Sequence, residues 1–163
     1  MHAYYFFLIF DFSNSNMKDK TIDYILRSTW QAVARMYNEE ASKYEGSMAI
    51  GFALLSIERE EGTPSTKISS RMGMEATSLT RTLKTLEEKG LIIRKPNPND
   101  GRGVLIYLTE EGKLKRELSK QTVLKFNETV KQHIPEEKLL HFVEVAEVIN
   151  ELIQDKNIFN QPE

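Results

Sequence analysis

The sequence predicts a mostly α-helical (α+β) fold: a winged helix-turn-helix with a two-stranded wing, flanked by long helices at both ends. Three observations support this fold class. Before residue 90 and after residue 109, apolar residues recur at three- and four-residue steps, as in amphipathic helices. Between these regions, "LIIRK" (91–95) and "VLIYLT" (104–109) are rich in branched side chains, as strands are. The segment "PNPNDGRG" between them has the composition of a loop, so the two runs form a hairpin with a long tip.

Breaks in the pattern set the boundaries of the first helices. Residues 17–45 form one helix, and after a break at Gly46 a second, more apolar helix continues to about Glu61–Gly62. Thr63 then supplies an N-cap and Pro64 the first position of a short helix, "PSTKISSRMG". All elements expected between residue 17 and Gly73 are therefore helices.

The remaining helices lie on both sides of the hairpin. Residues 77–89 form a helix with Gly90 as its C-cap. After the hairpin, Thr109 caps a helix that runs to about His133, and Ile134–Pro135 starts the last one. The apolar residues of the last helix cover more than one narrow stripe, so we expect it to bury two faces.

Composition limits the class of protein. The 163-residue chain has 22 basic and 24 acidic residues and no cysteine, which excludes disulfides, thiolate metal sites and cysteine-based redox sensing. The apolar run "AYYFFLIF" (3–10) is too short to span a membrane and has no secretory cleavage pattern. We expect a cytoplasmic protein in which residues 1–16 are an extension without a fold of its own and 156–163 a C-terminal tail. Alternatively, the aromatic residues within 1–16 pack on a partner subunit.

The helix over residues 77–89 has two different faces. Leu79, Leu83 and Leu86 fall on one side, which predicts the buried face. The opposite side carries small polar and basic side chains: Thr77, Ser78, Arg81, Lys84 and Thr85. Such a face suits a major groove, where arginine binds guanine and hydroxyls reach bases or phosphates, although an ordinary solvated surface is the alternative.

The segment around this helix is locally basic. From Thr66 to Arg102 there are eight basic and four acidic residues, whereas the rest of the chain has a net charge of −6. Positive charge is thus concentrated where a DNA-reading module requires it. Further predicted DNA contacts lie at the start of the short helix and along the hairpin: Ser65, Thr66, Arg94, Lys95, Asn99 and Arg102.

Arg102 stands between Gly101 and Gly103 at the predicted hairpin tip. The glycines let the backbone approach another surface closely, and an arginine suits the negative potential of a narrow minor groove. Asp100 would be repelled by phosphate, so we expect it to orient a guanidinium, either that of Arg102 or that of Arg94. The alternative for Asp100 is a turn-initiating Asp-Gly pair.

Two segments resemble a known family. "DGRGVLIYLTEEG" resembles the wing signature of the MarR (multiple antibiotic resistance regulator) family, with Asp100-x-Arg102, then Leu108–Thr109 and Gly112. "SLTRTLKTLEEKGLIIRK" resembles the recognition helix and first wing strand of that family. The resemblance covers residues 20–155 in element order and is specific at motif level over 63–112.

The resemblance implies a homodimeric bacterial transcription regulator, which we expect to be a repressor at a pseudo-palindromic operator. Residues 46–112 would be the DNA-binding domain, and 17–45 and 113–155 the dimerisation helices. The family's recognition positions match here at Thr77, Ser78 and Arg81, and its minor-groove arginine at Arg102. In that family a small aromatic or anionic effector binds between the dimerisation helices and the winged domain and weakens DNA binding.

Four residues of the first two helices are candidates for an effector pocket, although core packing is the alternative for each: Trp30, Tyr37, Met48 and Phe52. A metal shared by His133, His141 and a nearby glutamate is not expected, because the spacing fits no compact ligand motif. We expect no cofactor and no enzymatic activity, since phosphate-loop and nucleophile motifs are absent from the sequence. The alternative function is a winged-helix protein-interaction module without DNA binding.

Overall fold

The computed structural model describes residues 20–98 and 100–155, with the backbone alone at 76 and 100–102. These residues form six helices and a three-stranded sheet. The elements are α2 (Ile22–Ser42), α3 (Met48–Ser56), β1 (Thr63–Pro64), α4 (Ser65–Met72), α5 (Ala76–Glu88), β2 (Ile92–Asn97), β3 (Asp100–Leu108), α6 (Glu110–His133) and α7 (Glu136–Gln154). The predicted extension (1–16), the predicted tail (156–163) and Asn99 lie outside the described residues.

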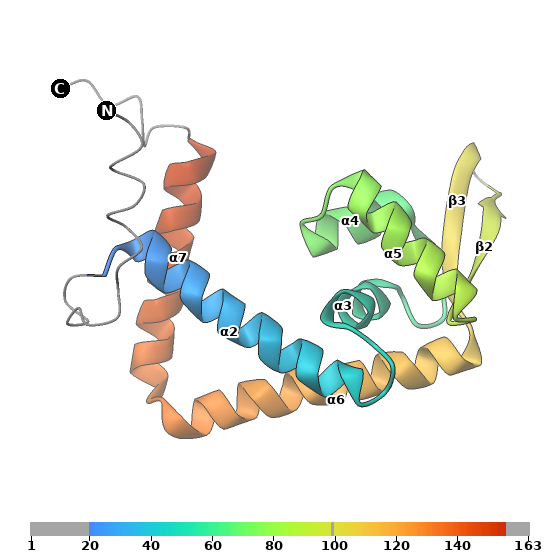
Figure 1. Cartoon of the computed structure of the whole chain (residues 1–163). Coiled ribbons are helices and arrows are strands. Elements are labelled where there is room, and N and C mark those ends of the chain that lie inside the picture. The colour runs from blue at the N-terminus through green and yellow to red at the C-terminus, as the bar shows by residue number, and fades with distance from the viewer. Residues whose placement is uncertain (1–19, 99, 156–163) are drawn as a thin grey trace, which may run out of the picture.

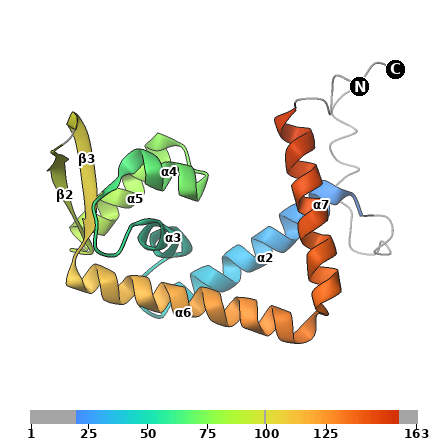
Figure 2. The same cartoon turned by 180° about the vertical axis from the view of Figure 1, so that it is seen from behind.

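The elements form a compact winged module and a set of long helices (Figure 1). In the module, α3 lies between α6 on one side and α4 with α5 on the other, and the β2–β3 hairpin stands at the end of α5. The long α6 runs from this module to α7, which turns sharply away from it; Figure 2 shows the same arrangement from behind. None of the described helices is long and apolar enough to cross a membrane.

The core of the module is built by the predicted helix faces. Leu79, Leu83 and Leu86 of α5 are buried, as their spacing predicted. They pack with apolar residues of α3, α4 and the sheet: Ala53, Leu54, Ile57, Ile68, Leu91, Ile92, Ile106 and Leu108. Because the leucines hold α5 by one side, its opposite side faces away from the core.

The sheet has three strands, so the prediction of a two-stranded wing was wrong in this detail. Its order is β1-β3-β2, with Thr63 paired to Ile106 and Pro64 to Leu105. The predicted N-cap role of Thr63 is also wrong, since Pro64 is the N-cap of α4. Thr63 is fully buried, and its hydroxyl accepts a hydrogen bond from the Glu58 N–H at 2.9 Å. Its backbone and side chain are thus occupied by the sheet and the preceding loop.

The hairpin tip is shorter than the loop composition suggested. β2 continues through Pro96 to Asn97 and β3 begins at Asp100, so the backbone of Arg102 lies within a strand. Proline is tolerated because β2 is an edge strand, where one side of the backbone has no strand to pair with. A register shift follows Pro96, and Asn97 pairs with Asp100.

Helix α3 ends at Ser56, earlier than the predicted end near Glu61. Ile57 is extended, with φ −91° and ψ 133°, and its side chain is fully buried. Arg116 of α6 donates from Nε to the Ile57 carbonyl at 3.2 Å, and Arg71 of α4 donates to the Ser56 carbonyl at 2.8 Å. The helix ends here because the Ile57 side chain is buried and because the two arginines, rather than the N–H groups of a further helical turn, donate to the Ser56 and Ile57 carbonyls.

Candidate nucleic-acid interface and ligand cavity

The outer face of α5 carries the predicted recognition residues. Thr77, Ser78, Arg81 and Lys84 are exposed. Thr85 is half-buried, and its hydroxyl donates to the Arg81 carbonyl at 3.1 Å, so it is turned to its own helix. The hydroxyls of residues 77 and 78 precede Arg81 by one turn, which places short side chains at the N-terminal end of α5.

The two cations of this face differ in their surroundings. Lys84 lies 3.7 Å from Glu88 in an i,i+4 pair whose side chains are both well exposed. Arg81 forms no ion pair with any side chain that the structure describes. Among the described side chains no carboxylate therefore neutralises the Arg81 guanidinium, whereas Lys84 is partly neutralised by Glu88.

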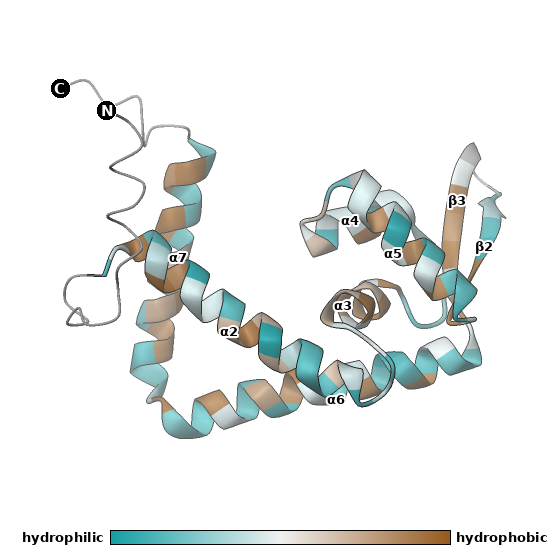
Figure 3. Ribbon diagram, viewed as in Figure 1, coloured by the Kyte–Doolittle hydropathy of each residue, from teal (hydrophilic) through white to brown (hydrophobic). Residues whose placement is uncertain are grey.

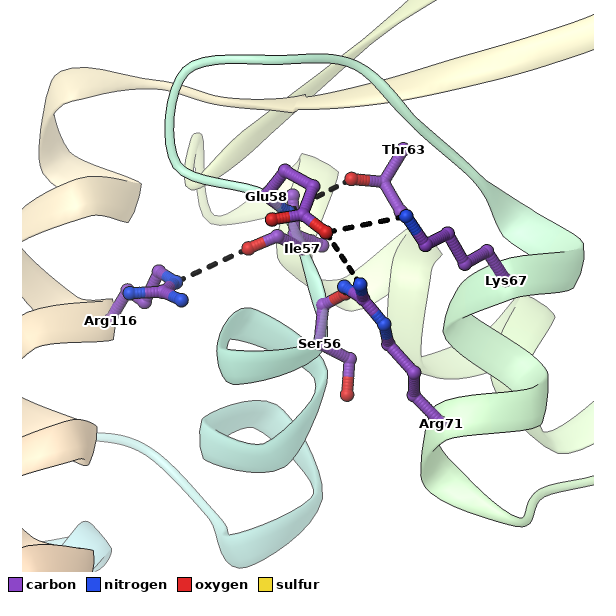
Figure 4. Close-up of polar contacts among 7 residues, drawn as sticks. All are labelled: Ser56, Ile57, Glu58, Thr63, Lys67, Arg71 and Arg116. Atoms are coloured by element: carbon purple, nitrogen blue, oxygen red, sulfur yellow. Dashed lines mark hydrogen bonds and ion pairs between the residues drawn. The ribbon is translucent and has the colours of Figure 1, made fainter.

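Helix α4 places the predicted residues Ser65 and Thr66 in its first turn, with Ser65 half-buried and Thr66 exposed. The two cations that follow them have protein partners (Figure 4). Glu58 lies 3.4 Å from the Lys67 ammonium and also pairs with the Arg71 guanidinium. The hydrogen bonds from Arg71 and then from Lys67 lower the pKa of Glu58.

The position of Glu58 lowers the local positive charge that the sequence predicted. The excess of four positive charges was counted over residues 66–102, which leaves out Glu58 at the start of the α3–β1 loop. Since the fold brings this carboxylate to Lys67 and Arg71, much of the charge on α4 is balanced within the protein. The cations left for a phosphate backbone are therefore fewer than the count suggested.

The wing places Arg94 and Lys95 on its edge strand. Arg94 pairs with Glu87 of α5, with 2.9 Å between Nε and Oε2. Lys95 lies over the Tyr107 ring, 4.9 Å from its centroid. Both side chains are thus held close to the sheet and α5. Of the two partners expected for Asp100, Arg94 already has a carboxylate from Glu87.

The side chains of Asp100 and Arg102 are outside the description, as is Asn99 as a whole. The backbone nevertheless places residue 102 at the third position of the central strand β3, close to the hairpin turn. The hairpin stands beside the C-terminal end of α5 (Figure 1). Exposed hydroxyls and the exposed Arg81 guanidinium can donate to bases or phosphates, while a cation on the neighbouring hairpin can reach an adjacent groove.

A cavity of about 280 Å³ lies between the long helices and the winged module. Tyr37, Met48 and Phe52 line it, three of the four residues predicted for an effector pocket. Trp30 is not among its lining residues; it lies on α2 with 53% of its side chain exposed. The 3.6-residue period places Trp30 on the apolar stripe of α2 but does not tell which neighbour covers each part of that stripe.

Aromatic contacts build the wall of this cavity. The Tyr37 ring lies edge-on to Phe52 of α3 and to Phe126 of α6, at 5.6 Å between centroids in each case. Burial raises the pKa of the Tyr37 hydroxyl. The α2–α3 turn is held by Asn38, whose Oδ1 accepts from the Met48 N–H at 3.0 Å. The cavity thus has an apolar interior whose shape depends on α2, α3 and α6 together.

Sequence reasoning missed the charged rim of the cavity. Lys89, from the end of α5, and Lys115 of α6 line it, as do three glutamates: Glu40, Glu45 and Glu111. The two lysines come from segments 26 residues apart, so no local motif joins them. The described residues contain no cluster of three or more metal-ligating side chains, and His133 Nδ1 lies 2.8 Å from the Thr129 carbonyl.

Comparisons with known proteins agree with this architecture. Residues 47–104 match the family model described as the MarR family. The chain is 28% identical over 110 residues to the HTH-type transcriptional regulator SarZ of Staphylococcus aureus, an alignment that covers 67% of this chain and 74% of SarZ.

Solved structures show the same fold over more of the chain. The MepR–DNA complex from S. aureus matches with a TM-score of 0.75 and 19% identity, covering 82% of this chain and 100% of MepR. A mutant of MarR from E. coli complexed with operator DNA matches at 0.71 and 25%, covering 83% and 99%. CouR from Rhodococcus jostii RHA1 bound to p-coumaroyl-CoA matches at 0.70 and 24%, covering 83% and 95%. These likenesses confirm the predicted fold.

Proposed function

Because residues 47–104 of this chain form a winged helix-turn-helix domain of the MarR family of transcription regulators, we propose that it binds a pseudo-palindromic operator as a homodimer and represses transcription. Its relatives are regulators and not enzymes, as predicted for this chain. An operator-binding protein works where the chromosome is, so the proposal includes the expected cytoplasmic location.

The main support for this proposal is the outer face of α5. Its three leucines fix the helix on the core, and Thr77, Ser78 and Arg81 are exposed on the other side. Arg81 has no ion-pair partner among the described side chains, so none of their carboxylates competes with a base edge for its donors. In this proposal Lys84, Thr66 and Lys95 contact phosphates, and Arg102 enters the minor groove. In this proposal Ser65, Thr85, Arg94 and Asn99 have supporting roles.

The long helices support a homodimer. No residue of α7 is buried within the single chain, although Figure 3 shows apolar residues along its length. The large apolar side chains of α2 and α7 with more than 40% exposure are Ile22, Ile25, Leu26, Trp30, Leu140, Phe142, Val143, Val145, Val148, Leu152 and Ile153. Soluble monomers rarely expose apolar surface of this extent. A second copy that covers it would use residues 17–45 and 113–155, with Trp30 in the interface rather than in the cavity.

Dimerisation determines how the two α5 helices meet DNA. We expect their separation to be about 34–36 Å, one turn of the duplex, so that both enter successive major grooves on one face. A small aromatic or anionic effector in the cavity, against Tyr37, Met48 and Phe52, would change this separation. To release DNA it must bind the DNA-incompetent arrangement more tightly. The CouR structure, with p-coumaroyl-CoA bound, is a case of ligand binding in the same fold.

Selection of bound duplexes from a random pool tests the proposed function. We expect enrichment of inverted repeats with half-sites about 10 base pairs apart, centre to centre. Affinity for the selected site should fall steeply with salt, with a logarithmic slope near −0.9 per phosphate neutralised. A chain that enriches no sequence and shows no salt-dependent binding would be a protein-interaction module instead.

A further inference from the structure

Glu58 places a negative charge beside both cations of helix α4. Its Oε1 lies 3.4 Å from the Lys67 ammonium and also accepts from the Arg71 guanidinium (Figure 4). Lys67 and Arg71 are four residues apart, so they lie on one face of α4. The three side chains are between 38% and 52% exposed. A molecule that binds this side of α4 therefore meets the carboxylate together with the two cations.

The backbone of Glu58 is held in place from both sides. Its N–H donates to the Thr63 hydroxyl at 2.9 Å, and Thr63 is fully buried and paired with Ile106 of β3. The preceding residue, Ile57, is also fully buried, and its carbonyl accepts from Arg116 of α6 at 3.2 Å. Because these contacts fix the backbone, the carboxylate stays close to α4.

The two cations that Glu58 contacts differ in their other bonds. Arg71 also donates to the Ser56 carbonyl at 2.8 Å, which ties its guanidinium to the end of α3. Lys67 lies in the first turn of α4, directly after the predicted DNA contacts Ser65 and Thr66. An ammonium is a compact point charge that suits a phosphate oxygen. A phosphate can therefore take over Lys67 without breaking the link between α3 and α4.

We propose that Glu58 is an internal competitor for DNA phosphate, a carboxylate that occupies Lys67 and so lowers the sequence-independent affinity of the chain for DNA. This rests on the proposed function and deepens it by naming a residue that limits the phosphate contacts. In a helix-turn-helix the first helix, here α4, crosses the phosphate backbone. A phosphate at the start of α4 is repelled by Glu58 while it is attracted by Lys67, and the two opposite charges largely cancel at longer distances.

Counterion release gives the size of this effect. Each phosphate that a cation neutralises on double-stranded DNA adds about −0.9 to the slope of log affinity against log salt concentration. An exposed ion pair such as that of Lys67 with Glu58 contributes little to stability, so a phosphate can displace the carboxylate only against a small cost. Removal of the Glu58 charge should therefore add about one phosphate contact to the binding of any duplex.

Fluorescence anisotropy with a random-sequence duplex, over a range of salt concentrations, tests the proposal on the full chain. Glu58→Gln removes the charge but keeps an oxygen that accepts from Arg71. At about 50 mM salt it should bind the duplex about three- to tenfold more tightly than the unchanged chain, with a slope steeper by about 0.9. Glu61→Gln, an exposed position in the same loop with the same change in net charge, is the matched control and should leave both values nearly unchanged.

The direction of the effect separates competition from a structural role. If Glu58 only supported the fold, its replacement would weaken DNA binding, whereas a competitor for phosphate strengthens it when removed. Lys67→Met in the Glu58→Gln background should abolish the gain, because the freed ammonium is then absent. Lys125→Met, with the same charge change in the second half of α6, should leave the gain in place.

Three results would overturn the competitor role: an unchanged slope in Glu58→Gln, weaker binding by that variant, or a gain that survives Lys67→Met. Binding of no duplex by either chain would refute the proposed function together with the competitor role. Operator binding by the unchanged chain, with an unaltered slope in Glu58→Gln, would refute the competitor role alone.

Discussion

Gly112, in the first turn of α6, lies directly against the backbone carbonyl of Leu91. A Cβ at position 112 would stand 1.9 Å from that oxygen, a distance at which the backbone itself must move. The same carbonyl accepts from the Thr109 N–H at 3.1 Å, and the Thr109 hydroxyl donates to the Gly90 carbonyl at 2.7 Å while accepting from the Gly112 N–H. These hydrogen bonds hold the start of α6 against the residues that directly follow α5.

Gly112→Ala should therefore destabilise the protein by about 1–3 kcal/mol, the usual cost of overpacking a filled site, despite the better helix propensity of alanine. Chemical denaturation followed by circular dichroism measures the change. Glu111→Ala, at the exposed neighbouring position, should alter the free energy of unfolding by less than about 0.5 kcal/mol. Equal effects of the two substitutions would mean that the contact with Leu91 is not close.

This junction explains why part of the fold was predictable. Thr109 directly precedes the helical pattern of α6, so a local cap signal identifies it, and the leucine period of α5 identifies its buried face in the same way. The carboxylate of Glu58 was missed because its partners Lys67 and Arg71 are 9 and 13 residues away. The third strand was missed because Thr63 pairs with Ile106 across most of the module. Contacts between residues that are far apart in the sequence produce no residue spacing from which they could be predicted.

Arg81→Ala should weaken operator binding by about 1–3 kcal/mol and relax the preference at one base pair in each half-site. The reason is that its guanidinium is exposed on the outer face of α5 with no ion-pair partner among the described side chains. Binding to a set of single-base variants of the selected operator measures both effects. Lys84→Ala is the control, and it should weaken binding to all of these sequences by the same factor. If Arg81→Ala did the same, Arg81 would be a phosphate contact.

Arg102→Ala should reduce affinity most for operators with A·T-rich flanks, where the minor groove is narrow and its potential most negative. The backbone of residue 102 is the third position of β3, close to the hairpin turn. Fluorescence anisotropy measures the affinity for operators with A·T-rich flanks and for operators with G·C-rich flanks. Lys120→Ala, on α6, should leave the ratio of the two affinities unchanged. The same ratio for Arg102→Ala as for the unchanged chain would place Arg102 outside the minor groove.

Replacing Leu152 and Ile153 with glutamate should give a folded monomer. Their side chains are 43% and 57% exposed in the single chain, and burying four charges in an apolar dimer interface is strongly unfavourable. Sedimentation velocity gives the mass, and circular dichroism shows whether the winged module remains folded. Ile93→Glu, at an equally exposed position on the wing, should remain dimeric. A dimer that persists in the double variant would place the interface elsewhere.

Glu58→Gln should remove a pH-dependent part of the stability. The folded-state pKa of Glu58 is depressed below its usual value of 4.5 by Arg71 and Lys67, so its contribution is fully present above pH 4.5 and is lost as pH falls through the lower folded-state value. Denaturation curves from pH 7 to pH 3 should therefore show the largest difference between the variant and the unchanged chain above pH 4.5, with the two converging below it. Glu61→Gln, an exposed position without an ion pair among the described side chains, is the control and should run parallel to the unchanged chain. A constant difference between the Glu58→Gln curve and that of the unchanged chain across this range would mean that the carboxylate supports α4 by packing or neutral hydrogen bonding rather than by charge.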